Sequence, residues 1–161
     1  MRGTSLQIRR VVTGHDQNGR AVVTIDETAT NVTSRRANHQ SCVIWSTGEF
    51  PADNDGERDG GAREVATTDP NGTVFRVIEY APGVAPRNHR TESVDYAIVM
   101  SGEIVMEIDG ATVHLRAGDV LVQRGTIHNW TNPGSQPCII AFVLVAAKPV
   151  ERAGKILSAT G

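Results

Sequence analysis

The apolar residues of this chain come in short runs rich in valine and isoleucine, and glycine, asparagine, aspartate and proline separate one run from the next. Short runs of this composition predict β-strands, and the residues between them are those that tight turns require. The pattern favours an all-β, antiparallel single domain, either a sandwich or a barrel. The strands that we predict are Leu6–Val12, Arg20–Ile25, Gln40–Trp45, Thr73–Tyr80, Val94–Met100, Ile104–Ile108, Ala111–Leu115, Val120–Gln123, Asn129–Thr131 and Cys138–Val145.

Length and charge limit the kind of protein. With 161 residues, the chain is long enough for one ordinary domain with its own core. Its 16 basic and 18 acidic residues are nearly balanced, without the basic stripe or aromatic-rich platform that nucleic-acid binding needs. We therefore expect a small-molecule substrate and no nucleic-acid partner.

Neither a membrane span nor a disulfide is expected. The longest apolar run, Cys138 to Ala147, is too short to cross a bilayer, and the first residues lack an apolar signal segment. Cys42 and Cys138 each lie in an apolar, strand-like run, which indicates reduced packing residues. These features predict a cytoplasmic protein.

The segment from Pro51 to Gly72 differs from the rest of the chain, because it holds glycines and acids and almost no apolar residue. We expect a mobile surface loop there, either a lid over a site or an insertion without a role. The predicted organisation is an N-terminal arm of strands over 1–40, a barrel over 41–147 that includes this loop, and a C-terminal tail over 148–161.

Polar residues alternate along the segment from Pro86 to Tyr96, between two apolar strands. In an extended chain alternate side chains share a face, and a polar face that points into a barrel needs partners such as water or a metal. The residues on this face are His89, Thr91, Ser93 and Asp95. A second segment, from Gly118 to Asn132, places His128 and Trp130 on one face of a strand.

Two neutral imidazoles and a carboxylate suit a divalent metal such as Zn, Fe, Mn, Ni or Cu. We therefore predict His89, Asp95 and His128 as metal ligands, which leave coordination positions open for water or substrate. For Asp95, a supporting role behind one imidazole stays open as an alternative. Thr91, Ser93 and Trp130 are predicted to line the pocket around the site.

The spacing of these residues resembles the two motifs of the cupin family. The first motif, G-x5-H-x-H-x3,4-E-x6-G, is matched by Gly83, His89, Asp95 and Gly102, with Thr91 in place of the second histidine and aspartate in place of glutamate. The second motif, G-x5-P-x-G-x2-H-x3-N, is matched by Gly118, Gly125, His128 and Asn132, with one residue fewer between the glycines and Arg124 where proline is usual. The resemblance implies a jelly-roll β-barrel of the small, single-domain cupin type.

Other candidate residues flank the motifs. Tyr96 and Arg124 are candidates for orienting an anionic or enolised substrate by a hydrogen bond, although a solvated turn residue is the simpler interpretation of Arg124. His114 alternates with apolar neighbours and should face solvent. His15 and His39 are predicted as surface residues, and His39 is the one expected to reach the barrel mouth.

These residues predict a metal-dependent enzyme that acts on a small oxygenated organic molecule. Lewis-acid chemistry, in a decarboxylase, dehydratase or isomerase, is favoured over dioxygenation because one histidine of the family pattern is missing. A non-catalytic small-molecule-binding cupin and a metal-free enzyme with histidine and Asp95 as acid and base remain alternatives. A homodimer is expected, since the apolar strand near Ile139–Val145 and the N-terminal strands need covering.

Overall fold

The computed structural model of the chain describes residues 6–56 and 58–161, and it confirms an all-β, antiparallel fold. No helix in these residues is long and apolar enough to cross a membrane. The strands are β1 (Arg9–His15), β2 (Ala21–Thr28), β3 (Val32–Thr33), β4 (His39–Thr47), β5 (Thr73–Tyr80), β6 (Ser93–Ser101), β7 (Glu103–Ile108), β8 (Ala111–Arg116), β9 (Val120–Arg124), β10 (Asn129–Thr131), β11 (Cys138–Ala146), β12 (Val150–Arg152) and β13 (Lys155–Leu157).

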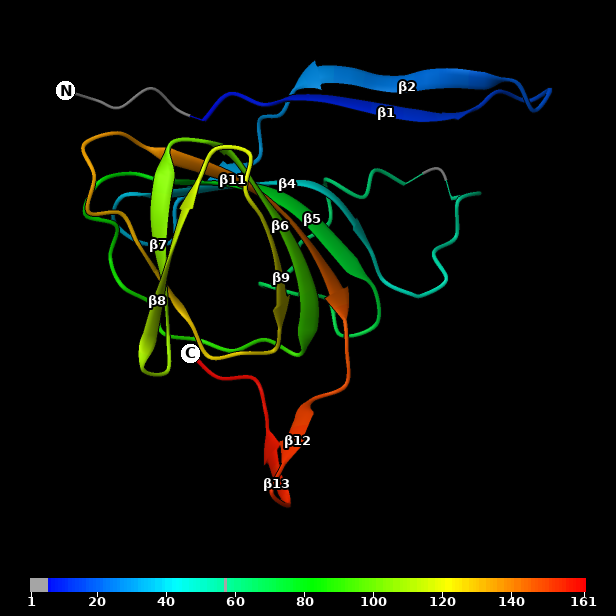
Figure 1. Ribbon diagram of the computed structural model, residues 1–161. Coiled ribbons are helices and arrows are strands. Elements are labelled where there is room, and N and C mark those ends of the chain that lie inside the picture. Colours follow the sequence, from blue (N-terminus) through cyan, green and yellow to red (C-terminus); the bar gives the residue numbers. More distant parts are fainter. Residues whose placement is uncertain (1–5, 57) are drawn as a thin grey trace.

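Two sheets face each other and form the barrel (Figure 1). The larger sheet has the order β3-β4-β5-β11-β6-β9, and the smaller has the order β10-β7-β8. All ten predicted strands are present, with ends shifted by a few residues. The strands that sequence reasoning missed are β3, β12 and β13, each only two or three residues long.

Period-two alternation gives the barrel its core. Along β6 and β11 every second residue is buried, and these inward residues interdigitate with those of the smaller sheet. Each buried Ile, Leu or Val contributes roughly 1.5–3 kcal/mol relative to an exposed position. The most deeply buried members are Val74, Ile104, Trp130 and Ile140.

Turns fix the register between the strands of the barrel. Asp109 and Gly110 form a two-residue hairpin between β7 and β8, as predicted, and Gly110 has a φ of 72°. Gly102, which matches the last glycine of the first motif, has a φ of 74°, and a Cβ there would lie 2.4 Å from the Pro137 carbonyl oxygen. A side chain at position 102 would therefore both strain the backbone and clash.

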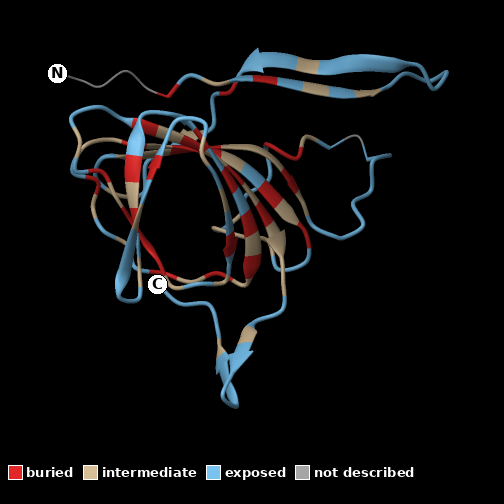
Figure 2. Ribbon diagram, in the orientation of Figure 1, coloured by how far each residue is buried: buried red, intermediate tan, exposed pale blue. Residues whose placement is uncertain are grey.

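The N-terminal arm lies outside the barrel. β1 and β2 form a hairpin that projects from the larger sheet, and most of its residues are exposed (Figures 1 and 2). The residues at its base pack on the outer face of that sheet, where Leu6 and Ala29 meet Cys42 and Val77 in a second apolar cluster. The arm therefore covers only part of the outer sheet face.

Apolar side chains remain exposed on the rest of that face. β11 is an interior strand, held between β5 and β6, so the predicted uncovered strand at Ile139–Val145 is not an edge of the sheet. The exposed apolar residues lie instead on β6 and the edge strand β9, namely Tyr96, Ile98, Met100, Val120 and Val122.

The loop from Pro51 to Gly72 has two different halves. Residues 51–56 are exposed, whereas the chain from Asp59 onward is anchored by named contacts. The buried Arg10 forms an ion pair with Asp59 at 2.7 Å, and the Ser46 hydroxyl donates to the Gly60 carbonyl at 2.8 Å. The predicted surface loop is therefore fixed in its second half, which runs along the barrel.

Candidate functional site

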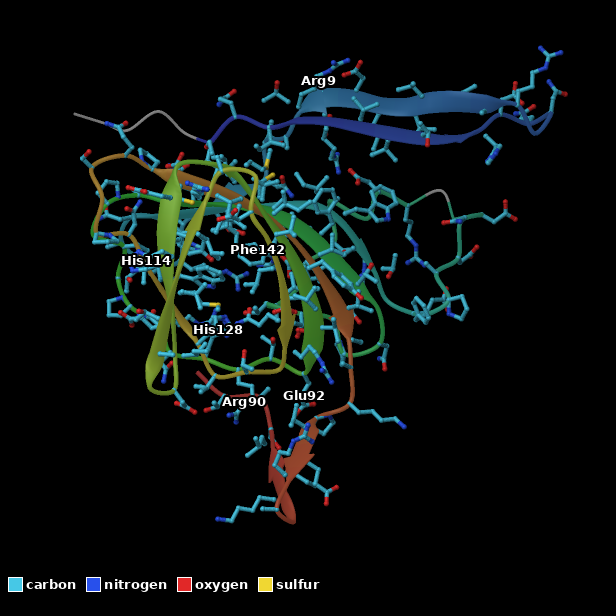
Figure 3. The ribbon with its side chains drawn as sticks, in the orientation of Figure 1. Arg9, Arg90, Glu92, His114, His128 and Phe142 are labelled. Atoms are coloured by element: carbon cyan, nitrogen blue, oxygen red, sulfur yellow. The ribbon has the colours of Figure 1, made fainter. Side chains whose placement is uncertain are left out.

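A cavity of about 1010 Å³ opens between the two sheets. Four of the predicted site residues line it, namely His89, Asp95, His128 and Trp130. In Figure 3 the labelled His128 lies between the sheets, as does Phe142 of β11. A cavity of this size, with polar groups converging on an otherwise apolar wall, is the usual form of a small-molecule site.

His89 and His128 form a pair within this cavity. Their backbones exchange two hydrogen bonds, from each amide nitrogen to the other residue's carbonyl oxygen at 2.9 Å. This bridge brings their rings to a centroid distance of 4.2 Å. The two motifs, nearly 40 residues apart in the sequence, thus deliver their histidines to one place.

The backbone also orients both imidazole rings. Nδ1 of His89 lies 3.1 Å from the Arg87 carbonyl oxygen, and Nδ1 of His128 lies 3.0 Å from the Thr126 carbonyl oxygen. Because a carbonyl only accepts, Nδ1 carries the proton in each neutral ring, and Nε2 is left with a lone pair. Burial lowers the pKa of both residues, and the neighbouring His128 adds to the effect that brings the pKa of His89 to about 4. Both rings are thus neutral bases at pH 7.

Asp95 is a buried carboxyl with a short chain of hydroxyls behind it. The Ser93 hydroxyl donates to Asp95 Oδ1 at 2.5 Å and lies 2.8 Å from Thr91 Oγ1. Burial raises the pKa of Asp95 to about 6, and the hydroxyl contacts only partly oppose this rise. Gln123 is paired with Asp95 across β6 and β9, and its Oε1 has no hydrogen-bond partner in the described part of the chain.

Two of the three predicted metal ligands form a donor pair. Neutral imidazoles with a free Nε2, oriented by backbone carbonyls, have the chemistry that a divalent metal needs. Asp95 lines the same cavity, yet within residues 6–56 and 58–161 no group of three or more His, Cys, Asp or Glu side chains lies close enough to hold an ion. The imidazole pair therefore fits a metal, whereas the role of Asp95 as a third ligand stays a prediction.

Several predicted site residues occupy other places. Tyr96 is half exposed on the outer face of β6, because it alternates with Asp95, and Arg124 is exposed beside the inward Gln123. These positions do not support a contact between either residue and a molecule in the cavity, and Arg124 matches the simpler interpretation as a solvated residue. Thr91 and Ser93 are buried behind Asp95 and do not line the cavity, so they support that carboxyl instead.

The remaining histidines match their predictions. His114 and His15 are exposed, and His39 at the start of β4 lines the cavity. Burial, followed by the positive charges of Arg36, Arg76 and Arg87, lowers the pKa of His39 to about 4. Cys42 and Cys138 are free and buried, as expected of packing residues.

Sequence reasoning missed the cationic side of the cavity. Among the residues that the structure describes, the lining includes five arginines, Arg35, Arg36, Arg63, Arg76 and Arg87, but only two acids, Glu64 and Asp95. One of these arginines had a visible signal, since Arg76 alternates with Ile78 and Tyr80 along β5 and so shares their inward face. The others come from irregular segments, where no period indicates a face.

The facing sheets, the two motif segments and the histidine pair between them define a cupin. The Cupin domain family matches residues 76–145. A cupin-domain-containing oxidoreductase of Aspergillus ruber, fogC, is 35% identical over 159 residues, covering 92% of this chain and 77% of that protein. The chain belongs to the cupin family.

Two further comparisons place the chain among known proteins. Phomopsin biosynthesis cluster protein C' of Diaporthe leptostromiformis is 44% identical over 90 residues, or 55% of this chain, and the match spans only 48% of that protein's length. In structure, the cupin domain of Cnp3 from Schizosaccharomyces pombe aligns with a TM-score of 0.53 over 87% of each chain at 10% identity. This second likeness concerns the fold alone.

Proposed function

We propose that this cupin is an enzyme that acts on a small oxygenated organic molecule held in the cavity between the two sheets. The observation that carries the proposal is that the His89–His128 pair and the buried Asp95 line one large cavity, whose wall also includes the apolar Phe142 and Leu144. A relative 35% identical across most of the chain is named an oxidoreductase, which supports a catalytic role.

The residues of the chain divide the chemistry between them. Asp95 has a raised pKa of about 6, so near neutral pH it exchanges a proton readily with a bound molecule. The hydroxyl of Ser93 holds the carboxyl in place during that exchange. Trp130, which is 2% exposed, forms part of the apolar wall of the cavity.

His89 and His128 are the residues that would hold a divalent metal. When bound there, the metal supplies Lewis-acid polarisation of a substrate oxygen, and a redox-active ion such as iron supplies oxygen chemistry instead. We favour proton-transfer chemistry of the decarboxylase, dehydratase or isomerase type, because Asp95 adds a proton-exchanging group to the pair. Without a metal, the same groups form an acid–base site.

Elemental analysis tests the metal, and turnover tests the enzyme. We expect stoichiometric metal in the purified protein, loss of that metal in His89→Ala and His128→Ala, and full retention in His114→Ala, which removes an exposed histidine of β8. Stoichiometric metal retained in His128→Ala would contradict the assignment.

Turnover is best followed by NMR on a panel of small hydroxy- and oxo-carbonyl compounds. Asp95→Asn keeps the size of the side chain and its contact with Ser93 but removes the exchangeable proton, so we expect turnover to fall by about 100-fold or more. Wild-type binding without turnover of any compound in the panel would favour a non-catalytic binding protein.

A further inference from the structure

Most of the arginines of the cavity lack an acidic partner, although Arg63 pairs with Asp69 at 2.9 Å. In the described residues, Arg35, Arg36 and Arg76 form no ion pair, whereas arginines elsewhere pair with named acids, as Arg9 does with Asp26. The chain as a whole carries slightly more acids than bases, so the local excess of cations is not a reflection of composition. Arg36 and Arg76 are each partly buried, and an unpaired cation in such a position favours the binding of an anion.

Individual nitrogens of this cluster are also without hydrogen bonds. Within the described residues, Nε and Nη1 of Arg36 and Nε of Arg76 are buried donors with no hydrogen-bond partner, and Nδ1 of His39 is a buried ring nitrogen that also has none. Other nitrogens are used to fix the side chains: Arg76 Nη2 donates to the Ala66 carbonyl at 2.6 Å, and Arg87 Nη2 donates to the Gly161 carbonyl at 2.7 Å. The guanidinium groups are thus held in place while part of their bonding capacity is unused.

The aromatic neighbours of the cluster give it a rigid base. The Arg36 guanidinium lies 6.0 Å above the ring of Tyr80, and His39 packs against the same ring edge-on at 5.5 Å. Cation–π contact of this kind positions a guanidinium without neutralising it. Burial, and after it the positive charges of Arg36 and Arg76, lowers the pKa of His39 to about 4, so this residue stays neutral beside the arginines.

An apolar strip separates this cluster from Asp95. In the larger sheet β11 lies between β5 and β6, with Phe142 opposite Arg76 and Leu144 opposite Asp95. All four residues line the cavity. Neighbouring strands lie about 4.8 Å apart and each residue rises about 3.4 Å, so two strand spacings and a two-residue offset separate the backbones of Arg76 and Asp95 by roughly 12 Å.

We infer that Arg36 and Arg76 form a subsite for the carboxylate group of the molecule that binds in this cavity, with its apolar body against Phe142 and Leu144. A carboxylate is planar and accepts two parallel N–H bonds, which is the geometry that a guanidinium offers. The strip of apolar side chains makes a carboxylate on an apolar body a better fit than a small hydrated anion. The inference rests on the proposed function only in one respect, the role of Asp95 at the end of the bound molecule opposite its carboxylate.

Binding of a defined probe tests the subsite without any assay of turnover. The probe is 4-phenylbutanoate, and 4-phenylbutanamide is the uncharged match of the same length and apolar surface. By isothermal titration, we expect the acid to bind the wild-type protein and the amide to bind about tenfold more weakly or worse. Arg76→Gln and Arg36→Gln should each remove the difference between acid and amide.

Controls separate the subsite from general charge and from the catalytic proposal. Arg20→Gln removes the same charge from the exposed end of the N-terminal hairpin and should leave both affinities unchanged. If Arg76→Gln fails to fold, because Arg76 also tethers Ala66, then Arg36→Gln decides alone. Equal binding of acid and amide, no binding at millimolar concentration, or binding of inorganic phosphate without the acid would each overturn the inference. Retained acid binding in Asp95→Asn, whatever its turnover, supports the subsite independently of the proposed reaction.

Discussion

Asp95→Asn should stabilise the protein, and increasingly so as the pH rises. The carboxyl is 3% exposed and its pKa is raised from 3.8 to about 6 by burial. A raised pKa in an acid means that the folded state holds its proton more tightly than the unfolded state. The wild-type protein therefore has its full stability below pH 4 and loses part of it as the pH rises through 6, where the folded carboxyl ionises.

The size of this loss follows from the shift. A difference of about 2 pKa units corresponds to about 3 kcal/mol at 1.36 kcal/mol per unit, fully present above pH 7. At pH 4, the same relation gives a loss of stability of only about 0.5 kcal/mol. For a domain of this size, 3 kcal/mol is roughly 6–12 °C in Tm.

The assay is thermal or urea unfolding of wild type and Asp95→Asn from pH 4 to pH 8, in chelator. The amide group of Asp95→Asn changes the free energy of unfolding by an amount that does not depend on pH. The diagnostic quantity is therefore how the difference in stability between wild type and variant changes with pH. Asp109→Asn, in the exposed β7–β8 turn, is the matched control. A difference between wild type and Asp95→Asn that stays constant over this range would refute the reasoning. If added Zn²⁺ or Mn²⁺ abolishes the pH dependence, the bound ion lowers the pKa of Asp95, which places the metal beside this carboxyl.

The other predictions address association, the loop and the motif. We propose that a second copy of the chain covers the exposed apolar residues of β6 and β9. Sedimentation velocity should then show a dimer for the wild-type protein and a monomer for Ile98→Glu. A monomeric wild-type protein would rule out the dimer. Asp59→Asn removes a partner of the buried Arg10 and should lower the free energy of unfolding, measured in urea, by about 1–3 kcal/mol. It should also change the affinity for 4-phenylbutanoate, because residues 61–67 line the cavity. If both quantities are unchanged, the ion pair between Arg10 and Asp59 does not anchor the loop. Thr91→His restores the missing motif histidine and should tighten metal binding about tenfold or more in a chelator competition; unchanged affinity would mean that this face does not reach the ion.

Period-two alternation explains both the successes and one failure of the sequence analysis. Alternation correctly placed Asp95 on the inward face of β6 and His114 on an outward face. The same rule, applied one residue further, would have excluded Tyr96 from the cavity, since it follows Asp95 directly in the strand. The phenol group of Tyr96 suggested a substrate contact, whereas its place in the strand indicates the outward face.

Contacts between residues far apart in the sequence could not be predicted from any local sequence pattern. The Arg36 side chain meets Tyr80 because β4 pairs with β5, a register that depends on the whole larger sheet. Likewise, residues 61–67 line the cavity beside the point where Arg10, far away in the sequence, pairs with Asp59. Spacing within a motif predicts which residues share a strand face, but only the folded sheet decides what lies opposite.

Arg76 and Asp95 lie on opposite sides of β11, so we expect one to bind the substrate and the other to take part in the reaction. Arg76 and Asp95 face the cavity from strands on either side of β11, with Phe142 and Leu144 between them. A molecule that places its carboxylate at Arg76 presents its other end to Asp95 and the histidine pair, so the arginine contact is the same in the ground state and the transition state. Loss of Arg76 should then raise KM and leave kcat nearly unchanged, whereas loss of Asp95 should lower kcat. The backbones of the two residues are roughly 12 Å apart and their side chains share no hydrogen-bond partner, although the charge of Arg76 lowers the pKa of Asp95. Their effects on kcat/KM should therefore come close to multiplying in the double variant Arg76→Gln/Asp95→Asn. A double variant no worse than Asp95→Asn alone would mean that the arginines and the carboxyl act as one coupled unit.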